Sequence, residues 1–367
     1  MEKNGLPKYM QLKQQLLEQI KDGQMQPGDQ LQTEFELSDA YKMSRQTVRQ
    51  AIGELVQEGR LYRVQGKGTF VAASAAPAKK AEETEKTIGI ITTYISDYIF
   101  PLIVRGAEAE LRSRGYRLML SSTDNDKTKE RESLELMMSH PLSGLIIEPT
   151  KSAEGNPNLH YYLSMGMSDI PFIMINERYP EMDCPCVKLD DEKGGFRAAE
   201  HLIELGHRRI VGFFKTDDLQ GIQRLKGFIR AHRDYKVPLD PDAVVRYSTE
   251  DKEERPYEAA QVLLASSTRP TAFVCYNDQL AVHLLETARQ AGLRVPQDLS
   301  IIGFDDSSLA TATEVKLTTL THPKTEMGVE AARRLIDRIE GITAGGAEDD
   351  SYIYEPQLVI RSSTGPV

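Results

Sequence analysis

The chain has 367 residues, which is more than one ordinary hydrophobic core accommodates and indicates two or three domains. Hydrophobic residues make up 40%, as in globular proteins, and no run of about 20 apolar residues could span a membrane. No apolar signal region follows the N-terminus, and Cys184, Cys186 and Cys275 are too few for a disulfide framework. We therefore expect a cytoplasmic protein.

The net charge of −10 is unevenly distributed along the chain. Residues 1–72 hold ten Lys/Arg and nine Asp/Glu, so the acidic charge belongs to residues 73–367. A nearly neutral N-terminal segment has little non-specific attraction for phosphates. If this segment binds DNA, we expect it to act as a dimer that reads two half-sites.

Residues 8–20 predict an amphipathic helix, because their apolar side chains recur at helical spacing. After a break at Pro27, Thr33 and Glu36 have the spacing of a capping box, which predicts a short second helix that ends near Tyr41. The pair of helices leads directly into a third.

Residues 44–56 predict that third helix, with Ser44 placed to cap its N-terminus. Its apolar face carries Val48, Ile52, Leu55 and Val56. The opposite face begins with Arg45, Gln46 and Arg49. Arg can bond guanine bidentately and Gln can bond adenine, so this turn suits a DNA major groove. Taken alone, the pattern also fits a solvated helix with surface arginines.

The stretch after the helix favours DNA binding. Residues 61–64 and 69–72 are β-rich and flank a small, basic tip at 65–68. This predicts a hairpin whose tip can lie in a minor groove or along phosphates. A helix followed by such a hairpin indicates a winged helix-turn-helix domain over residues 1–72.

This segment resembles the DNA-binding domain of the GntR family of bacterial repressors. The matching fragments are Pro7-Lys8-Tyr9-Met10-Gln11-Leu12, Gln26-Pro27-Gly28-Asp29-Gln30-Leu31, Thr33-Glu34, Ser44-Arg45-x-Thr47-Val48-Arg49-x-Ala51 and Gly66-x-Gly68-Thr69-Phe70-Val71. The resemblance implies that Arg45, Arg49 and Gly66 touch DNA and that Thr47 contacts a phosphate. The predicted DNA-binding residues are Lys8, Glu34, Ser44, Arg45, Gln46, Thr47, Arg49, Gln65, Gly66, Lys67 and Gly68.

Residues 73–86 lack apolar periodicity and predict a linker. From residue 87 onward, short β runs alternate with helices. The predicted strands are 88–92, 117–121, 144–148, 172–175, 210–214, 272–275, 300–304 and 317–320. The predicted helices are 102–114, 131–138, 194–206, 223–232, 254–264, 278–291 and 326–340. This alternation is typical of a doubly wound α/β sheet, and residues 87–367 are long enough for two such subdomains.

Polar side chains follow many of these strands, at the edge where open α/β sheets bind ligands. Hydrogen-bonding groups beside aromatic rings would suit a polyhydroxylated ligand. Each could instead cap a helix, as Asp278 and Asp306 could. The predicted effector-binding residues are Tyr94, Ser96, Tyr98, Glu177, Arg178, Asp190, Arg224, Asn277, Asp305 and His322.

This region resembles the effector-binding part of the lactose/galactose repressor family, which is similar to periplasmic sugar-binding proteins. The matching fragments are Gly194-Gly195-x5-His201-Leu202-x2-Leu205-Gly206-His207-x2-Ile210, Arg224-x2-Gly227-Phe228, Pro270-Thr271-Ala272-x3-Tyr276-Asn277-Asp278-x2-Ala281, Leu299-Ser300-Ile301-Ile302-Gly303-Phe304-Asp305-Asp306 and Leu317-Thr318-Thr319-Leu320. The resemblance implies that Arg224, Asn277 and Asp305 bond a sugar. A polar residue at the position of His322 often joins them, although some relatives carry Gln there.

A GntR-type N-terminal domain joined to this sugar-binding region resembles the arabinose-type repressors of Gram-positive bacteria. The resemblance implies a homodimer that releases operator DNA on binding L-arabinose, with dimer contacts from helices such as 102–114. A different sugar or polyol remains open as the effector. We expect no cofactor, no metal and no membrane partner.

Two other classes of function remain as alternatives. An enzyme is disfavoured for two reasons. The acidic pairs, Asp190-Asp191 and Asp305-Asp306, are adjacent in sequence, so the two carboxylates of each pair point apart rather than at one bond. In addition, no nucleophile, P-loop or metal-ligand motif is present. A transport-type sugar-binding protein would leave the N-terminal domain without a role.

Overall fold

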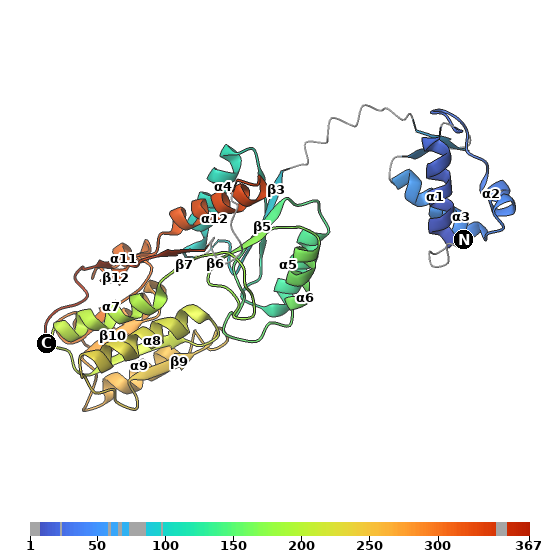
Figure 1. The fold of residues 1–367 in the computed structure, drawn as a ribbon. Helices are drawn as coiled ribbons and strands as arrows, with labels where there is room; N and C mark the ends of the chain where they lie inside the picture. Colours follow the sequence, from blue (N-terminus) through green and yellow to red (C-terminus); the bar gives the residue numbers. More distant parts are fainter. Residues whose placement is uncertain are drawn as a thin grey trace. The chain divides into compact units, whose positions relative to one another are not determined.

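The computed structural model describes residues 8–22, 24–57, 60–64, 68–72, 86–96, 98–342 and 351–367. The chain forms two compact units, Met1–Glu83 and Thr84–Val367, which we call the N-terminal and C-terminal units (Figure 1). Within the described ranges, none of the helices combines the length and apolarity that crossing a membrane requires.

The N-terminal unit is a three-helix domain with a β-hairpin. Its elements are α1 (Lys8–Lys21), α2 (Glu34–Ala40), α3 (Arg45–Gln57), β1 (Leu61–Val64) and β2 (Gly68–Val71). The two strands pair antiparallel, as predicted for the wing. The buried side chains are Leu12, Leu16, Leu31, Leu37, Val48, Ala51, Ile52, Leu55, Leu61 and Val71.

The predicted capping box at the start of α2 is present. The hydroxyl of Thr33 accepts the N–H of Glu36 at 3.3 Å, and the carboxylate of Glu36 accepts the N–H of Thr33 at 2.8 Å. Two otherwise unpaired backbone donors are thereby satisfied, which fixes where this short helix begins.

The C-terminal unit contains two subdomains. The first has a parallel sheet in the order β13-β7-β6-β5-β3-β4. Its strands are β3 (Thr87–Thr92), β4 (Arg117–Ser122), β5 (Gly144–Ile147), β6 (Phe172–Asn176), β7 (Cys186–Leu189) and β13 (Tyr352–Tyr354). Its helices are α4 (Phe100–Ser113), α5 (Lys127–Met138), α6 (Leu159–Met167) and α12 (Lys324–Ile339).

Both faces of this sheet are covered by helices. In β5, Ile146 packs into the cluster that includes α4 and α12, whereas Leu145 and Ile147 pack into the cluster that includes α5 and α6. Burial on both faces explains why the strand reads as an unbroken apolar run. Figure 1 shows α4 and α12 side by side, and these helices are in extensive contact.

The second subdomain has a parallel sheet in the order β11-β10-β8-β9. Its strands are β8 (Ile210–Lys215), β9 (Val244–Tyr247), β10 (Ala272–Cys275) and β11 (Ser300–Ile302). Its helices are α7 (Asp191–Glu204), α8 (Leu219–Asp234), α9 (Arg255–Ala265), α10 (Asp278–Gln290) and α11 (Leu309–Ala312). A short antiparallel pair, β12 (Thr319–Leu320) and β14 (Leu358–Val359), lies beside it.

Helices α7 and α8 approach each other closely because two glycines lie at their crossing. A Cβ at Gly195 would lie 2.0 Å from the carbonyl oxygen of Arg224, and a Cβ at Gly227 would lie 2.0 Å from that of Glu192. Any larger side chain would therefore separate the helices and displace Arg224.

Some predicted strands are shorter than expected. The strand expected at 300–304 ends at Ile302, and beyond it the chain forms an isolated parallel bridge, between Asp305 and Thr321. The strand expected at 317–320 shrinks to its last two residues. Strands β7, β9, β13 and β14 and helices α6 and α11 were not among the predicted elements, because each is short and has weak periodicity.

Candidate effector pocket and DNA-reading face

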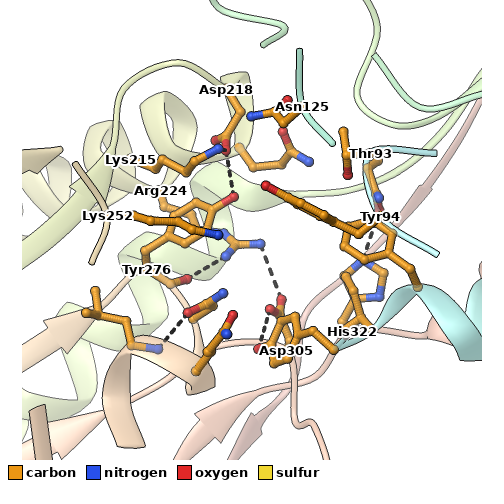
Figure 2. Close-up of a pocket in the computed structure, with 18 of the residues that line it drawn as sticks. Thr93, Tyr94, Asn125, Lys215, Asp218, Arg224, Lys252, Tyr276, Asp305 and His322 are labelled. Atoms are coloured by element: carbon orange, nitrogen blue, oxygen red, sulfur yellow. Dashed lines mark hydrogen bonds and ion pairs between the residues drawn. The ribbon is translucent and has the colours of Figure 1, made fainter. Parts of the chain in front are cut away.

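The C-terminal unit has a cavity at the carboxyl ends of both parallel sheets. The chain passes between the subdomains after β7, after β12 and after β13, and the cavity lies between them. Figure 2 shows side chains from both subdomains directed toward one another across it. This is the position that open α/β sheets use for ligands.

Arg224 is the central charged group of the pocket (Figure 2). It is 4% exposed and projects from α8. Its Nε donates to Asp191 at 2.7 Å, its Nη1 donates to the carbonyl of Tyr276 at 2.5 Å, and its Nη2 lies 3.4 Å from Asp305. Its guanidinium also packs 3.6 Å from the centre of the Phe304 ring. These contacts fix the guanidinium plane at the wall of the cavity.

The carboxylates near Arg224 have perturbed acidity. Burial raises the pKa of Asp191 to about 7, although the guanidinium of Arg224 opposes the shift. Burial also raises the pKa of Asp278 to about 7, and the neighbouring carboxylate of Asp305 adds to the shift. Each acid is held by donors: Asp278, for example, accepts the N–H of Ser307 at 2.7 Å.

Tyr98 connects the two subdomains. It follows β3 in the first subdomain, yet its hydroxyl donates to Asp305 of the second subdomain at 2.7 Å and accepts the N–H of Asp278 at 3.1 Å. Tyr98 has a positive φ of 59° and Asp305 one of 96°. Backbone strain at both ends of one contact is typical of a functional site.

A second charged group lies at the end of β8. Lys215 contacts Asp217 at 2.9 Å and Asp218 at 3.0 Å, and the hydroxyl of Tyr276 donates to Asp218 at 2.8 Å. Burial lowers the pKa of Lys215, but the two carboxylates outweigh it and hold that pKa above its ordinary value. The lysine is therefore charged and already neutralised by its own neighbours.

The opposite wall carries a chain of hydrogen bonds. The carboxylate of Glu148 accepts the N–H of Thr93 at 2.8 Å and the side-chain amide of Asn176 at 2.7 Å. The oxygen of that amide therefore faces Nε2 of His322 at 3.1 Å, so Nε2 carries the proton. Nδ1 of His322 is then a buried acceptor without a partner among the described residues. Burial lowers the pKa of His322 to about 4, which keeps the ring neutral.

Further contacts close the rim of the cavity. Asn125 donates to Thr249 across the two subdomains at 2.6 Å, and Lys151 forms an ion pair with Glu250. Ser152 accepts a backbone N–H from the start of α8 at 2.9 Å. The structure therefore represents a closed arrangement of the two subdomains.

Several predicted effector-binding residues line this cavity. They are Tyr94, Tyr98, Arg224, Asn277, Asp305 and His322. Asn277 also caps α10, because its side chain accepts the N–H of Leu280 at 2.9 Å. Asn277 therefore caps a helix and lines the cavity at once, and its contact with a sugar remains a prediction.

The other predicted residues lie outside the cavity lining. Asp190 caps α7 by accepting the N–H of Lys193 at 2.9 Å, and the next residue, Asp191, faces the cavity instead. Glu177 pairs with Lys188 at 2.8 Å. Arg178 donates to the carbonyl of Cys184 at 3.2 Å, and Ser96 is exposed. Asn176, with a φ of 65°, turns the chain at this point, so that it lines the cavity while residues 177 and 178 do not.

The predicted set also omitted polar residues that line the cavity. These are Thr93, Asn125, Glu148, Asn176, Asp191, Lys215, Asp218 and Tyr276. All of them lie at the end of a strand, in the segment that follows it or at the start of the next helix, which is the signal that could have identified them. The described residues contain no group of three or more His, Cys, Asp or Glu side chains arranged to hold a metal ion.

In the N-terminal unit, α3 presents the predicted reading face. Val48 and Ile52 are buried, whereas Arg45, Gln46 and Arg49 are exposed. The N-terminus of the helix is capped, because the hydroxyl of Ser44 accepts the N–H of Thr47 at 3.2 Å and bonds its hydroxyl at 2.8 Å. Lys8 is exposed at the start of α1. The DNA contacts of these residues remain predictions.

Glu34 holds one arginine of the reading face. Its carboxylate accepts hydrogen bonds from Arg49, at 2.9 Å, 3.0 Å and 3.3 Å, and lies 3.9 Å from Arg63 of the wing. Glu34 is thus placed to orient Arg49, and its own contact with DNA remains a prediction. Gly68 has a positive φ of 120°, and a Cβ there would lie 2.7 Å from the side chain of Gln30. The predicted contacts Gln65, Gly66 and Lys67 lie outside the described residues.

Comparisons with known proteins agree with both units. The model of bacterial regulatory proteins of the gntR family matches residues 8–71, and that of the periplasmic binding protein-like domain matches residues 199–364. A LacI family transcriptional regulator from Enterococcus faecium, solved with bound ribose, has a TM-score of 0.66 at 27% identity, covering 77% of this chain and 100% of that chain.

Full-length relatives share the complete architecture. The arabinose metabolism transcriptional repressor of Geobacillus stearothermophilus is 59% identical, with 99% of each chain covered. The arabinose metabolism transcriptional repressor of Halalkalibacterium halodurans is 47% identical, with 97% of this chain and 96% of that protein covered. The chain is thus a DNA-binding regulator and not an enzyme, and it belongs to the family of arabinose metabolism transcriptional repressors, which join a GntR-type winged helix to a LacI-type sugar-binding domain.

Proposed function

We propose that this repressor binds operator DNA as a homodimer in the cytoplasm and releases it when L-arabinose occupies the cavity between the two subdomains. We infer a neutral sugar because the buried cations of the cavity are already paired with carboxylates. No cofactor is required for this switch.

The charges of the cavity favour a neutral ligand over a phosphorylated one. Arg224 is held by Asp191 and Asp305, and Lys215 by Asp217 and Asp218. An added phosphate would have to displace these carboxylates, or be repelled by them. Sugar hydroxyls, in contrast, can donate to the carboxylates and accept from the cations without breaking the ion pairs.

The size of the cavity favours a small sugar. Its volume is about 140 Å³. A bound water needs about 10–15 Å³ of cavity volume, so about nine to fourteen water-sized groups fit, which covers the non-hydrogen atoms of a pentose or a hexose but not of a larger sugar. Two further observations support this class: the relatives are named for arabinose metabolism, and the similar Enterococcus faecium regulator was solved with ribose.

A bound sugar can cause release of DNA only if it binds one arrangement of the two subdomains more tightly than the other. The cross-cleft contacts of Tyr98 and Asn125 belong to the closed arrangement. A sugar enclosed by both walls stabilises that arrangement, and we propose that closure changes the spacing of the two DNA-binding units of the dimer.

Isothermal titration calorimetry with the full chain tests the choice of effector. The titrants are L-arabinose, D-xylose, D-ribose, D-galactose and a pentose phosphate. We expect L-arabinose to bind most tightly and the phosphate not to bind. Tighter binding of the pentose phosphate would contradict the inference from the cavity's charges, and preference for a hexose would contradict the choice of L-arabinose as effector.

A further inference from the structure

Phe35 is an exposed aromatic residue beside the reading face. It lies in the first turn of α2, next to Glu34, and is 62% exposed, whereas Leu37 of the same helix is buried at 2%. The guanidinium of Arg45 lies 4.9 Å from the centre of the Phe35 ring. A single exposed apolar side chain is ordinary on a protein surface. This one, however, contacts an arginine predicted to read a base.

Two adjacent residues of α2 thus hold the two arginines of α3. Glu34 accepts hydrogen bonds from Arg49, and Phe35 lies against Arg45. Both arginines project from the first two turns of α3, the part of such a helix that meets base edges. The Phe35 ring therefore belongs to the surface that faces the major groove when α3 is bound there.

The Phe35 ring keeps most of its area open while Arg45 occupies one side of it. In the major groove, the one apolar group that a base pair presents is the 5-methyl group of thymine, and aromatic rings are among its partners. The positive charge of Arg45 against the ring suits the negative potential of DNA better than an apolar protein partner.

We propose that Phe35 is a specificity-determining residue, which contacts the 5-methyl group of a thymine next to the base read by Arg45. The ring has two effects. It limits the orientations of the Arg45 guanidinium through a cation–π contact, and it favours thymine at one operator position through burial of the methyl group. This inference rests on operator binding by α3.

The experiment uses duplexes selected from a random library by the purified full chain. In the tightest duplex, each thymine is replaced in turn by deoxyuridine, which removes only the 5-methyl group. Affinities are measured by fluorescence anisotropy for the unmodified chain and for Phe35→Ala. We expect one position per half-site at which deoxyuridine weakens binding by the unmodified chain about fourfold, the value for burial of one methyl-sized group.

At that position, Phe35→Ala should be insensitive to the replacement, while its affinity for the parent duplex falls. Tyr62→Ala is the matched control: Tyr62 is also an exposed aromatic residue of the N-terminal unit, but it stacks on Phe70 in the wing, 5.6 Å between ring centres. Its pattern of deoxyuridine effects should equal that of the unmodified chain.

The inference is overturned if the same deoxyuridine effects persist in Phe35→Ala, or if no replacement has an effect. A Phe35→Ala chain that binds every duplex normally would assign the ring to a protein partner instead. Failure of the unmodified chain to select any duplex would count against operator binding itself, so the two failures are distinguishable.

Discussion

Removing the hydroxyl of Tyr98 tests whether closure of the cavity depends on a contact between the two subdomains. The hydroxyl donates to Asp305 at 2.7 Å across the cleft. A hydrogen bond to a charged group contributes about 1.5–3 kcal/mol, so Tyr98→Phe should lower the population of the closed arrangement, relative to the open one, by about tenfold or more. The N–H of Asp278 keeps its bond to the carbonyl of Phe304 at 2.9 Å, so no backbone donor is left unpaired.

The expected result is a rise of up to about tenfold in the Kd for L-arabinose, because the apparent Kd is inversely proportional to the fraction of binding-competent protein. Part of the lost affinity for L-arabinose is offset, because the oxygen of Asp305 that Tyr98 no longer occupies can accept a hydrogen bond from a sugar hydroxyl. Calorimetry gives the Kd. Hydrogen exchange without sugar gives the second readout: the amides at the start of α10 should exchange faster.

Tyr161→Phe provides the control. Tyr161 also donates to a carboxylate, that of Glu135, but both residues are on the outside of the first subdomain. Tyr161→Phe should leave the Kd for L-arabinose and the hydrogen-exchange rates at the start of α10 unchanged. An unchanged Kd and unchanged exchange in Tyr98→Phe would refute the idea that this contact governs closure.

Three further predictions follow from the packing and the charges. Gly195→Ala should lower the free energy of unfolding by about 2 kcal/mol or more, because its Cβ would lie 2.0 Å from a carbonyl oxygen of α8. Gly166→Ala, in the exposed part of α6, is the control: its Cβ would meet no atom outside its own helix within 4 Å, so it should raise the free energy of unfolding by about 0.5–1 kcal/mol. Denaturant unfolding measures both changes. Asp278→Asn should be more stable than the unmodified chain at pH 8 and lose that advantage progressively as the pH falls from about 7 to about 4. Burial raises the pKa of Asp278 from 3.8 to about 7, so between these two values the carboxyl is ionised only in the unfolded chain, and its stability cost grows with pH across this window and is constant above it. Thermal unfolding from pH 8 to pH 4 would contradict the assignment if the difference were constant. Arg49→Ala should weaken operator binding by about 1–3 kcal/mol without changing the affinity for sugar, and unchanged binding by anisotropy would remove this side chain from base reading.

Local patterns were sufficient to predict much of the fold. The apolar spacing of Val48, Ile52 and Leu55 predicted the buried face of α3, and these side chains are buried. The apolar run at 145–147, within the strand predicted at 144–148, predicted a strand covered on both faces, as β5 is. Both patterns are formed by residues close together in the sequence, so they can be recognised without knowledge of the tertiary structure.

The cavity was predictable only in part, because its walls depend on contacts between distant segments. The position of Arg224 at a helix and of Asp305 after a strand marked them as candidates, but the bond from Tyr98 to Asp305 spans 207 residues. The choice between Asp190 and Asp191 depends on which of the two caps α7. The positive φ of Asn176, which turns the chain before Glu177, likewise has no local sequence signal.

The most direct test of sugar control over DNA binding is a titration of the operator complex with L-arabinose, followed by fluorescence anisotropy. We expect the full chain to release its duplex as the sugar saturates, and Arg224→Ala to hold the duplex at every sugar concentration. An unmodified chain that binds L-arabinose by calorimetry yet keeps its duplex with unchanged affinity would contradict control of DNA binding by the sugar.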